Sequence, residues 1–271
     1  MEGYADGSWT PARQLYAVAA LIAPAQAWAA LQTPWSQVLR RADPELEIFH
    51  RADLYSPYVE PYCRWDDAKR ARVLAELTRL LAGTAKYAVA GVLLKDEYDS
   101  FCGRHGRPLG VTPYELCADT CIGFVSKWLE ANDLGSERVA YFSEAGDREH
   151  GGSGQFSDSI QRIIRRFAQY REEMRIASAS FVSKRDAPAL QTADLLAYEF
   201  THCRPDIGEP TETLRTLAPT FPIHPVYLHG ELLEDLASRY TDAVEKQVRK
   251  DYTLWRPHRK RRNLSEPPNS P

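Results

Sequence analysis

The segment FVSKRDAPALQTADLLAY, residues 181–198, joins the end of an expected strand to an apolar helix and decides how the fold is interpreted. A polar loop with Lys184 follows the strand, and Pro188 stands where a first-turn proline favours a helix. On that helix Gln191 and Asp194 share one face by their spacing. A carboxylate on an apolar helix is costly to bury without a partner. Asp194 therefore either reaches solvent or an arginine at the helix edge, or belongs to a functional site.

Strands and helices alternate along the rest of the chain. Short apolar runs predict strands at 14–23, 86–94, 138–143 and 179–183, with residues 1–6 pairing with 14–23 through a turn at 7–13. Apolar spacing and capping residues predict helices that begin near positions 24, 66, 112, 157 and 188. Loops are expected at 98–111 and 201–229, and an amphipathic helix at 231–251. This alternation indicates an α/β layer fold.

Composition excludes several classes of protein. The chain has 271 residues, of which 44% are hydrophobic and 26% charged, so it is neither disordered nor fibrous overall. The longest apolar run, residues 16–24, is too short to span a bilayer, which predicts a cytoplasmic protein with no membrane partner. A net charge of -3 excludes a globally basic nucleic-acid coat. The same net charge is compatible with an enzyme that holds nucleic acid through a metal.

The five cysteines form no CxxC pair. Cys117 and Cys121 are four residues apart and so share one helix face. Zinc would need two more ligands arranged in space, so free, buried thiols are the simpler interpretation.

Three further places offer acidic side chains. Glu144 follows an expected strand end, Asp6 stands at the end of the expected first strand, and EIFHRADL at 47–54 offers Glu47, His50 and Asp53. Taken singly, each is typical of an exposed turn acid. Carboxylates that converge at one sheet edge form a site for Mg²⁺ or Mn²⁺, and two such ions can activate a water against a phosphodiester. A nearby lysine or histidine adds charge stabilisation or proton transfer.

Several of these segments resemble one protein family. FVSKRDAPALQTADLLAY looks like the C-terminal signature of the DUF3800 family, in which a strand ending in a small polar residue and lysine precedes an LQLADLIAY-like helix. LYAVAALIAP, HRADL and VAYFSEAG are similar to other segments of that family. The resemblance covers residues 1–202 and implies a ribonuclease H-like mixed central sheet flanked by helices. The rest of the chain is expected to be a C-terminal helical extension at 203–255, with a loop and helix packed on the core, followed by a basic, disordered tail at 256–271.

The resemblance also implies a function and its residues. Asp6, Glu144 and Asp194 would be the metal ligands and catalytic acids, His50 would orient substrate or shuttle a proton, and Lys184 would contact a phosphate. The implied activity is that of a metal-dependent nuclease, with Mg²⁺ or Mn²⁺ as cofactor and RNA or DNA as partner. Gln191 would orient its neighbours through hydrogen bonds.

The chain departs from the family pattern at two positions. Gly7 replaces the family glutamate after Asp6, and the glutamate of the HRADL-like segment would fall at Ile48. Only five residues precede Asp6, so the first strand is expected to be short or to begin upstream. An alternative is therefore a catalytically decayed member that binds nucleic acid or protein. A third is an interaction module using 231–251 and the basic run RPHRKRR at 256–262. The oligomeric state stays open.

Overall fold

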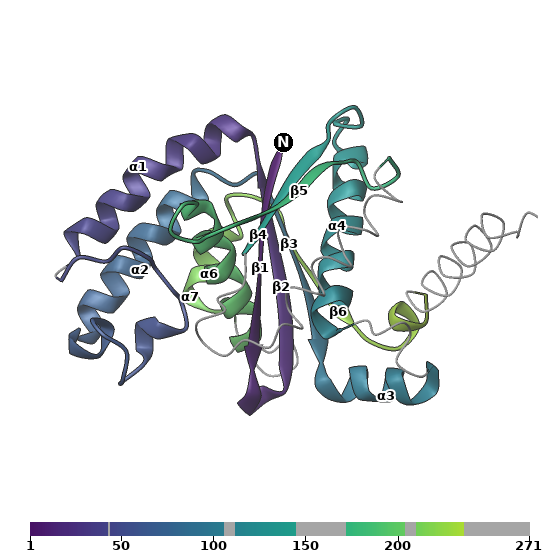
Figure 1. The fold of residues 1–271 in the computed structure, drawn as a ribbon, viewed down its shortest axis with the longest axis horizontal. Helices are drawn as coiled ribbons and strands as arrows, with labels where there is room; N and C mark the ends of the chain where they lie inside the picture. The colour runs from purple at the N-terminus through teal and green to yellow at the C-terminus, as the bar shows by residue number, and fades with distance from the viewer. Residues whose placement is uncertain (43, 106–111, 145–171, 204–209, 236–271) are drawn as a thin grey trace, which may run out of the picture.

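A computed structural model describes residues 1–42, 44–105, 112–144, 172–203 and 210–235. Its centre is a mixed six-stranded sheet with the order β5-β4-β1-β2-β3-β6 (Figure 1). Strand β2 is antiparallel to both β1 and β3, whereas β4 is parallel to β1 and to β5, and β6 is parallel to β3. The strands are β1 (Glu2–Thr10), β2 (Leu15–Ala23), β3 (Tyr87–Leu94), β4 (Val139–Glu144), β5 (Ile176–Val182) and β6 (Ile223–Leu228). The α/β class is confirmed.

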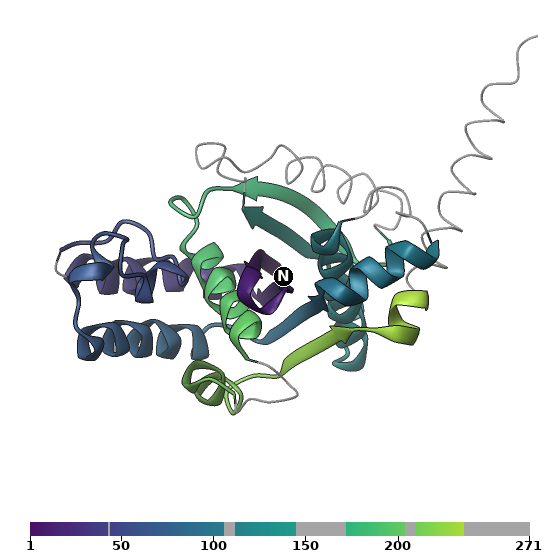
Figure 2. The same cartoon turned by 90° about the horizontal axis from the view of Figure 1, so that it is seen from below.

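Helices cover both faces of the sheet. Figure 1 shows α1, α2, α6 and α7 on one side and α4 on the other, and Figure 2 shows the sheet between α6 and α4. Helix α6 packs on β1 and β2, and α4 packs on β2 and β3. The helices are α1 (Ala25–Arg41), α2 (Asp67–Ala82), α3 (Lys95–His105), α4 (Pro113–Ala131), α6 (Pro188–His202) and α7 (Glu212–Leu217).

The predicted caps at the starts of α2 and α4 are confirmed. Asp66 accepts a hydrogen bond from the backbone N–H of Lys69 at the start of α2. Thr112 and Glu115 form a reciprocal capping box at the start of α4, with a proline in its first turn. Local side-chain chemistry therefore sets where these helices begin.

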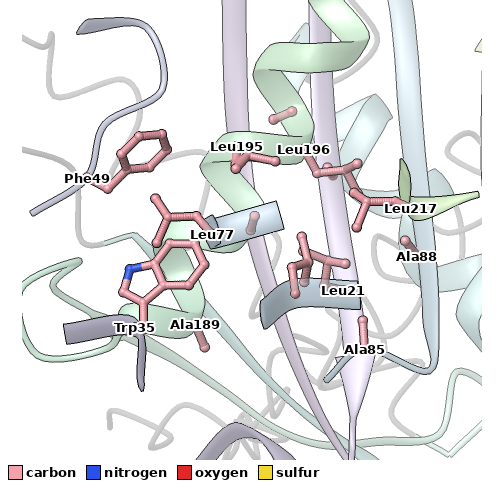
Figure 3. Close-up of a cluster of buried hydrophobic side chains, with 14 of the residues drawn as sticks. Leu21, Trp35, Phe49, Leu77, Ala85, Ala88, Ala189, Leu195, Leu196 and Leu217 are labelled. Atoms are coloured by element: carbon pink, nitrogen blue, oxygen red, sulfur yellow. The ribbon is translucent and has the colours of Figure 1, made fainter. Parts of the chain in front are cut away.

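The larger core lies under α6. Small residues of β2 and β3 face this helix, namely Ala17, Ala19, Ala23, Ala88 and Ala90. Their size lets α6 approach the sheet closely. Figure 3 shows Trp35 and Phe49 beside Leu77 and Leu195 in this cluster, and all four are fully buried. Each such side chain contributes about 1.5–3 kcal/mol by leaving water, so α1 and the segment before residue 50 are held firmly against α6, and α2 packs on α1 and α7.

The first hairpin is longer than predicted. Strand β1 pairs with β2 from Glu2–Ala23 to Thr10–Leu15, so residues 7–10 belong to the strand and not to the turn. The turn is the single 3₁₀ turn Pro11–Arg13, closed by Gln14 in the left-handed region at φ 51°. Asp6 therefore lies in the middle of β1, and the expectation of a short strand that ends there is wrong.

Two expected loops contain regular structure. Residues Lys95–His105 form α3, where a glycine-rich loop was expected; Asp96 and Glu97 favour a helix in its first turn. The proline-rich stretch 201–229 contains α7 and β6. Pro225 fits in β6 because this strand lies at the edge of the sheet.

Some predicted features fall on residues that the structure does not describe. The expected turn at 151–154, the helix near 157–170 and the tail at 256–271 lie outside the described residues. Of the helix expected at 231–251, residues 230–235 are helical and the remainder from 236 lies outside the description. None of the helices in the described parts of the chain is both long and apolar enough to cross a membrane.

Candidate active site

Three carboxylates from three elements surround one lysine. The Nζ atom of Lys184 lies 2.8 Å from Oδ2 of Asp6, 2.9 Å from Oε2 of Glu144 and 3.1 Å from Oδ1 of Asp194. Asp6 comes from β1, Glu144 ends β4, and Asp194 lies on α6. The structure thus brings together all three acids that the sequence predicted, together with Lys184.

Strand register explains this convergence. The last residues that pair β1 with β4 are Ala5 and Ser143, so Asp6 and Glu144 stand one step beyond, at matching positions. Glu144 is itself opposite Val182 at the end of β5, two residues before Lys184. In parallel strands, residues at matching positions point to the same face. The cluster therefore lies where the parallel strands β4 and β5 end, the usual position of α/β sites.

The cluster is buried and strongly charged. Asp6, Asp194 and Lys184 are each less than 10% exposed, whereas Glu144 is partly open to solvent. Burial raises the pKa of Asp6 to about 7, although the charge of Lys184 opposes that rise. Burial alone would lower the pKa of Lys184, but the three carboxylates outweigh it and raise that pKa. Lys184 is therefore a permanent cation at the centre of the cluster.

His50 extends the site towards solvent. Its Nε2 atom lies 3.2 Å from Oδ1 of Asp194 and its Nδ1 atom 3.1 Å from Oδ2 of Asp53. Hydrogen bonds with Asp194 and then Asp53 raise the pKa of His50 to about 10, so the imidazole is protonated at neutral pH. Burial alone would raise the pKa of Asp194, but the hydrogen bond from His50 and the charge of Lys184 lower it to about 2.

The next residue, Arg51, anchors this segment to α6. Its backbone N–H donates to Oδ2 of Asp194 at 2.7 Å, and its Nε donates to Oε1 of Glu199 at 2.7 Å. The guanidinium also lies over the ring of Tyr198 at 4.4 Å. Arg51 and Glu199 are both buried. Backbone and side chain of Arg51 thus fix His50 against Asp194.

Gln191 orients its neighbours through hydrogen bonds, the role that the family resemblance implied for it. Its Oε1 atom accepts hydrogen bonds from Nε1 of Trp35 at 2.8 Å and from the backbone N–H of Phe49 at 2.9 Å. Its Nε2 donates to the carbonyl of Lys184 at 2.8 Å. Gln191 thereby ties α1, the segment before His50 and the lysine loop together, one helical turn from Asp194.

Gly7 does not remove an acid from this cluster. Successive strand residues point to opposite faces, so position 7 faces α4 and not Asp194. A Cβ atom at Gly7 would lie 2.6 Å from Cε2 of Tyr114, so the tyrosine ring fills the space that a side chain would need. The departure from the family pattern at this position is therefore compatible with an intact cluster.

One predicted acid is not among the three around Lys184, and three residues of the site were not predicted. Glu47 is exposed and pairs with Arg185, the residue after Lys184. Sequence reasoning missed the roles of Arg51, Glu199 and Tyr114. Arg51 was visible within the HRADL-like segment, but its partner on α6 is a long-range contact with no local signal.

The cysteines are free thiols, as expected. The Sγ atom of Cys121 is buried and donates to the carbonyl of Val18 at 3.2 Å. Across the described ranges, no group of three or more His, Cys, Asp and Glu side chains has the arrangement of a metal site. The three carboxylates of the cluster are arranged about the Lys184 ammonium instead. Comparisons with protein-family models, with curated proteins and with solved structures find no match.

Proposed function

We propose that the protein is a metal-dependent phosphodiesterase of ribonuclease H-like fold that hydrolyses nucleic acid, as its resemblance to the DUF3800 family implies. One observation carries the proposal: Asp6, Glu144 and Asp194, from three separate elements, share a single cation position. The mixed sheet, with the antiparallel β1-β2-β3 on one side and the parallel β4 and β5 on the other, supports the fold assignment.

The residues present fit a hard divalent cation. Their donor atoms are all carboxylate oxygens, which Mg²⁺ and Mn²⁺ prefer. Four carboxylates, with Asp53, face only two cationic groups, Lys184 and His50. Burial is the main cause of the raised pKa of Asp6, and the charges of Asp194 and Glu144 add to it. Asp6, Glu144 and Asp194 would hold the ion, which would supply charge stabilisation at the phosphate oxygens and make a water more acidic.

The side chains around the carboxylates have separate tasks. Lys184 is a fixed cation within reach of a phosphate bound at the cluster, where it offsets the charge that develops on the phosphate oxygens. His50 is protonated and half open to solvent, so it can donate a proton to the leaving oxygen. The backbone N–H of Arg51 holds Asp194 in one orientation.

Cleavage assays test this proposal. RNA, DNA and RNA–DNA hybrid substrates are incubated with Mg²⁺ or Mn²⁺ and wild-type protein or the Asp194→Asn variant. The wild type should cleave at least one substrate, and Asp194→Asn should be slower by about 100-fold or more. The matched control is Asp99→Asn on α3, whose carboxylate pairs with Lys95 at the surface. Equal rates for wild type and Asp194→Asn, or no cleavage of any substrate, would contradict the proposal.

A second candidate is a binding protein that uses the same fold without metal. The position of Lys184 favours it, because its ammonium already contacts all three carboxylates. Thermal unfolding with increasing Mn²⁺ separates the two functions. A metal-binding site gains stability by mass action, about 2.7 kcal/mol at a hundredfold excess over Kd. A cluster that Lys184 fills permanently gains none.

A further inference from the structure

The segment that follows His50 presents aromatic rings in two different environments. Residues 55–65 have the sequence YSPYVEPYCRW. Tyr62 and Trp65 are buried and pack edge to face, with ring centroids 5.1 Å apart. Tyr55 and Tyr58 are instead 47% and 89% exposed. In the described parts of the chain only two other large apolar side chains, Trp9 and Leu94, are exposed.

The buried rings fix the path of this segment. The hydroxyl of Tyr62 donates to the carbonyl of Ile48, and the carbonyl of Tyr62 accepts from Arg70 Nη2 at 3.0 Å. Lys69 of α2 lies over the Trp65 ring at 4.6 Å. The exposed tyrosines are therefore held by an anchored loop, which lowers the entropy cost of binding a ligand on them.

Tyr55 is also joined to the carboxylate cluster. Its ring lies 5.2 Å from the guanidinium of Arg51, whose backbone N–H binds Asp194. The Arg51–Glu199 pair that holds this arrangement is buried, and buried ion pairs contribute little net stability compared with apolar residues. The role of this ion pair is better explained by the residues that it holds in position, which are His50 on one side and Tyr55 on the other.

The charges near these tyrosines largely cancel. Arg64 pairs with Glu60 at 2.7 Å, and Arg70 pairs with Asp67 at 2.9 Å. A ligand of this surface is therefore attracted through ring stacking more than through phosphate pairing. Bases stack on tyrosine when they are unpaired, whereas a duplex hides their faces.

We infer that Tyr55 and Tyr58 form a stacking platform for unpaired bases next to the scissile phosphodiester, so that the substrate class is single-stranded nucleic acid. This inference rests on the proposed function for the position of the phosphodiester. In this arrangement the bases on one side of that bond stack on the loop at 55–58, and the sugar–phosphate backbone lies at the carboxylate cluster.

Binding measured without cleavage tests the platform. Fluorescence anisotropy of labelled oligonucleotides is recorded in EDTA with single-stranded RNA, single-stranded DNA and the corresponding duplexes. Wild-type protein should prefer a single strand, and the Tyr55→Ala/Tyr58→Ala double variant should bind it about tenfold or more weakly. The Tyr55→Phe/Tyr58→Phe variant keeps the rings and should retain binding. Since stacking dominates, affinity should depend only weakly on salt.

The matched control is Trp9→Ala, which removes an exposed ring that stacks on Tyr16 away from the loop. Equal binding of duplex and single strand, no loss in the Tyr→Ala variant, an equal loss in Trp9→Ala, or no binding to any oligonucleotide would overturn the inference. Binding with this pattern but no cleavage would overturn the proposed hydrolysis alone. Cleavage that the Tyr→Ala variant leaves unchanged would overturn the platform alone.

Discussion

Lys184 determines the charge balance of the site. Its ammonium touches three carboxylates, two of which are almost fully buried. The family resemblance implied a phosphate contact for this lysine, and the structure adds that it is the internal counter-ion of the cluster. On the proposed function, a metal ion would take over part of that neutralisation, so lysine and metal would compete for the same oxygens.

Replacing Lys184 tests that competition. Lys184→Met should lower the free energy of unfolding at neutral pH by about 3–5 kcal/mol, because buried carboxylates lose their counter-ion. Mn²⁺ should restore part of that loss, since it neutralises the same oxygens. Denaturant unfolding with and without Mn²⁺ measures both effects. Arg185→Met, which removes an exposed pair with Glu47, should cost less than about 1 kcal/mol. A loss that Mn²⁺ cannot reverse would argue against the metal site.

His50 gives stability a dependence on pH. Its folded pKa of about 10 lies above the ordinary value of 6.5, so the folded state binds the proton more tightly. The resulting stability is fully present below about pH 6.5 and is lost as the pH rises towards 10. Unfolding measured from pH 6 to 10 in EDTA should therefore show a smaller decline for His50→Gln than for wild type. His224→Gln, on the exposed edge strand β6, should keep the wild-type decline.

At the scale of elements, the segment before α2 is held to α6 by adjacent contacts. Phe49, His50 and Arg51 bind Gln191, Asp194 and Glu199. Two atoms of the buried pair, Nη1 of Arg51 and Oε2 of Glu199, have no hydrogen-bond partner among the described residues. Such a pair is expected to specify position more than to add stability.

Mutations of the Arg51–Glu199 pair distinguish its contribution to positioning from its contribution to stability. Glu199→Ala should destabilise the protein by about 3–5 kcal/mol, because it leaves the Arg51 guanidinium buried and unpaired. The double variant Arg51→Met/Glu199→Met should recover most of that loss, since neither charge remains. Denaturant unfolding measures both variants. If the double variant is as unstable as Glu199→Ala, the pair is itself an important source of stability.

Helix α4 approaches the sheet closely at one glycine. A Cβ atom at Gly91 of β3 would lie 2.5 Å from the carbonyl oxygen of Cys117, which belongs to the α4 backbone. At Gly7 of β1 the corresponding contact is 2.6 Å from the Tyr114 ring, a side chain that can shift. The α4 backbone cannot move without displacing the whole helix, so position 91 tolerates a larger side chain less well than position 7.

Alanine substitutions should rank accordingly. Gly91→Ala should cost more than Gly7→Ala, whose overpacking cost is about 1–3 kcal/mol. Gly103 of α3 has no atom within 4 Å of an added Cβ, so Gly103→Ala should be neutral or stabilise by up to about 1 kcal/mol. Melting temperatures of the three variants test the order. A Gly91→Ala variant as stable as Gly103→Ala would show that α4 can move away from β3.

At the scale of the molecule, sequence reasoning predicted local features better than distant ones. The strand at 14–23, the caps of α2 and α4, and the helix with Asp194 all follow from spacing and side-chain chemistry within a few residues. The role of Lys184 as a shared counter-ion and the identity of the partner of Arg51 could not be predicted in this way. These contacts join residues far apart in sequence. Strand β6 was missed because Pro225 is typical of a loop unless the strand lies at an edge.

The cluster also has a consequence for how the chain acquires its site. Asp6 leaves the ribosome with the first strand, whereas Asp194 follows only after β4 and β5 have been made. Until then Asp6 is an ordinary solvated carboxylate, and a nascent chain has no means of capturing a divalent ion there. On the proposed function, cation binding would report completion of the long-range topology and would serve as a kinetic probe of the global folding step.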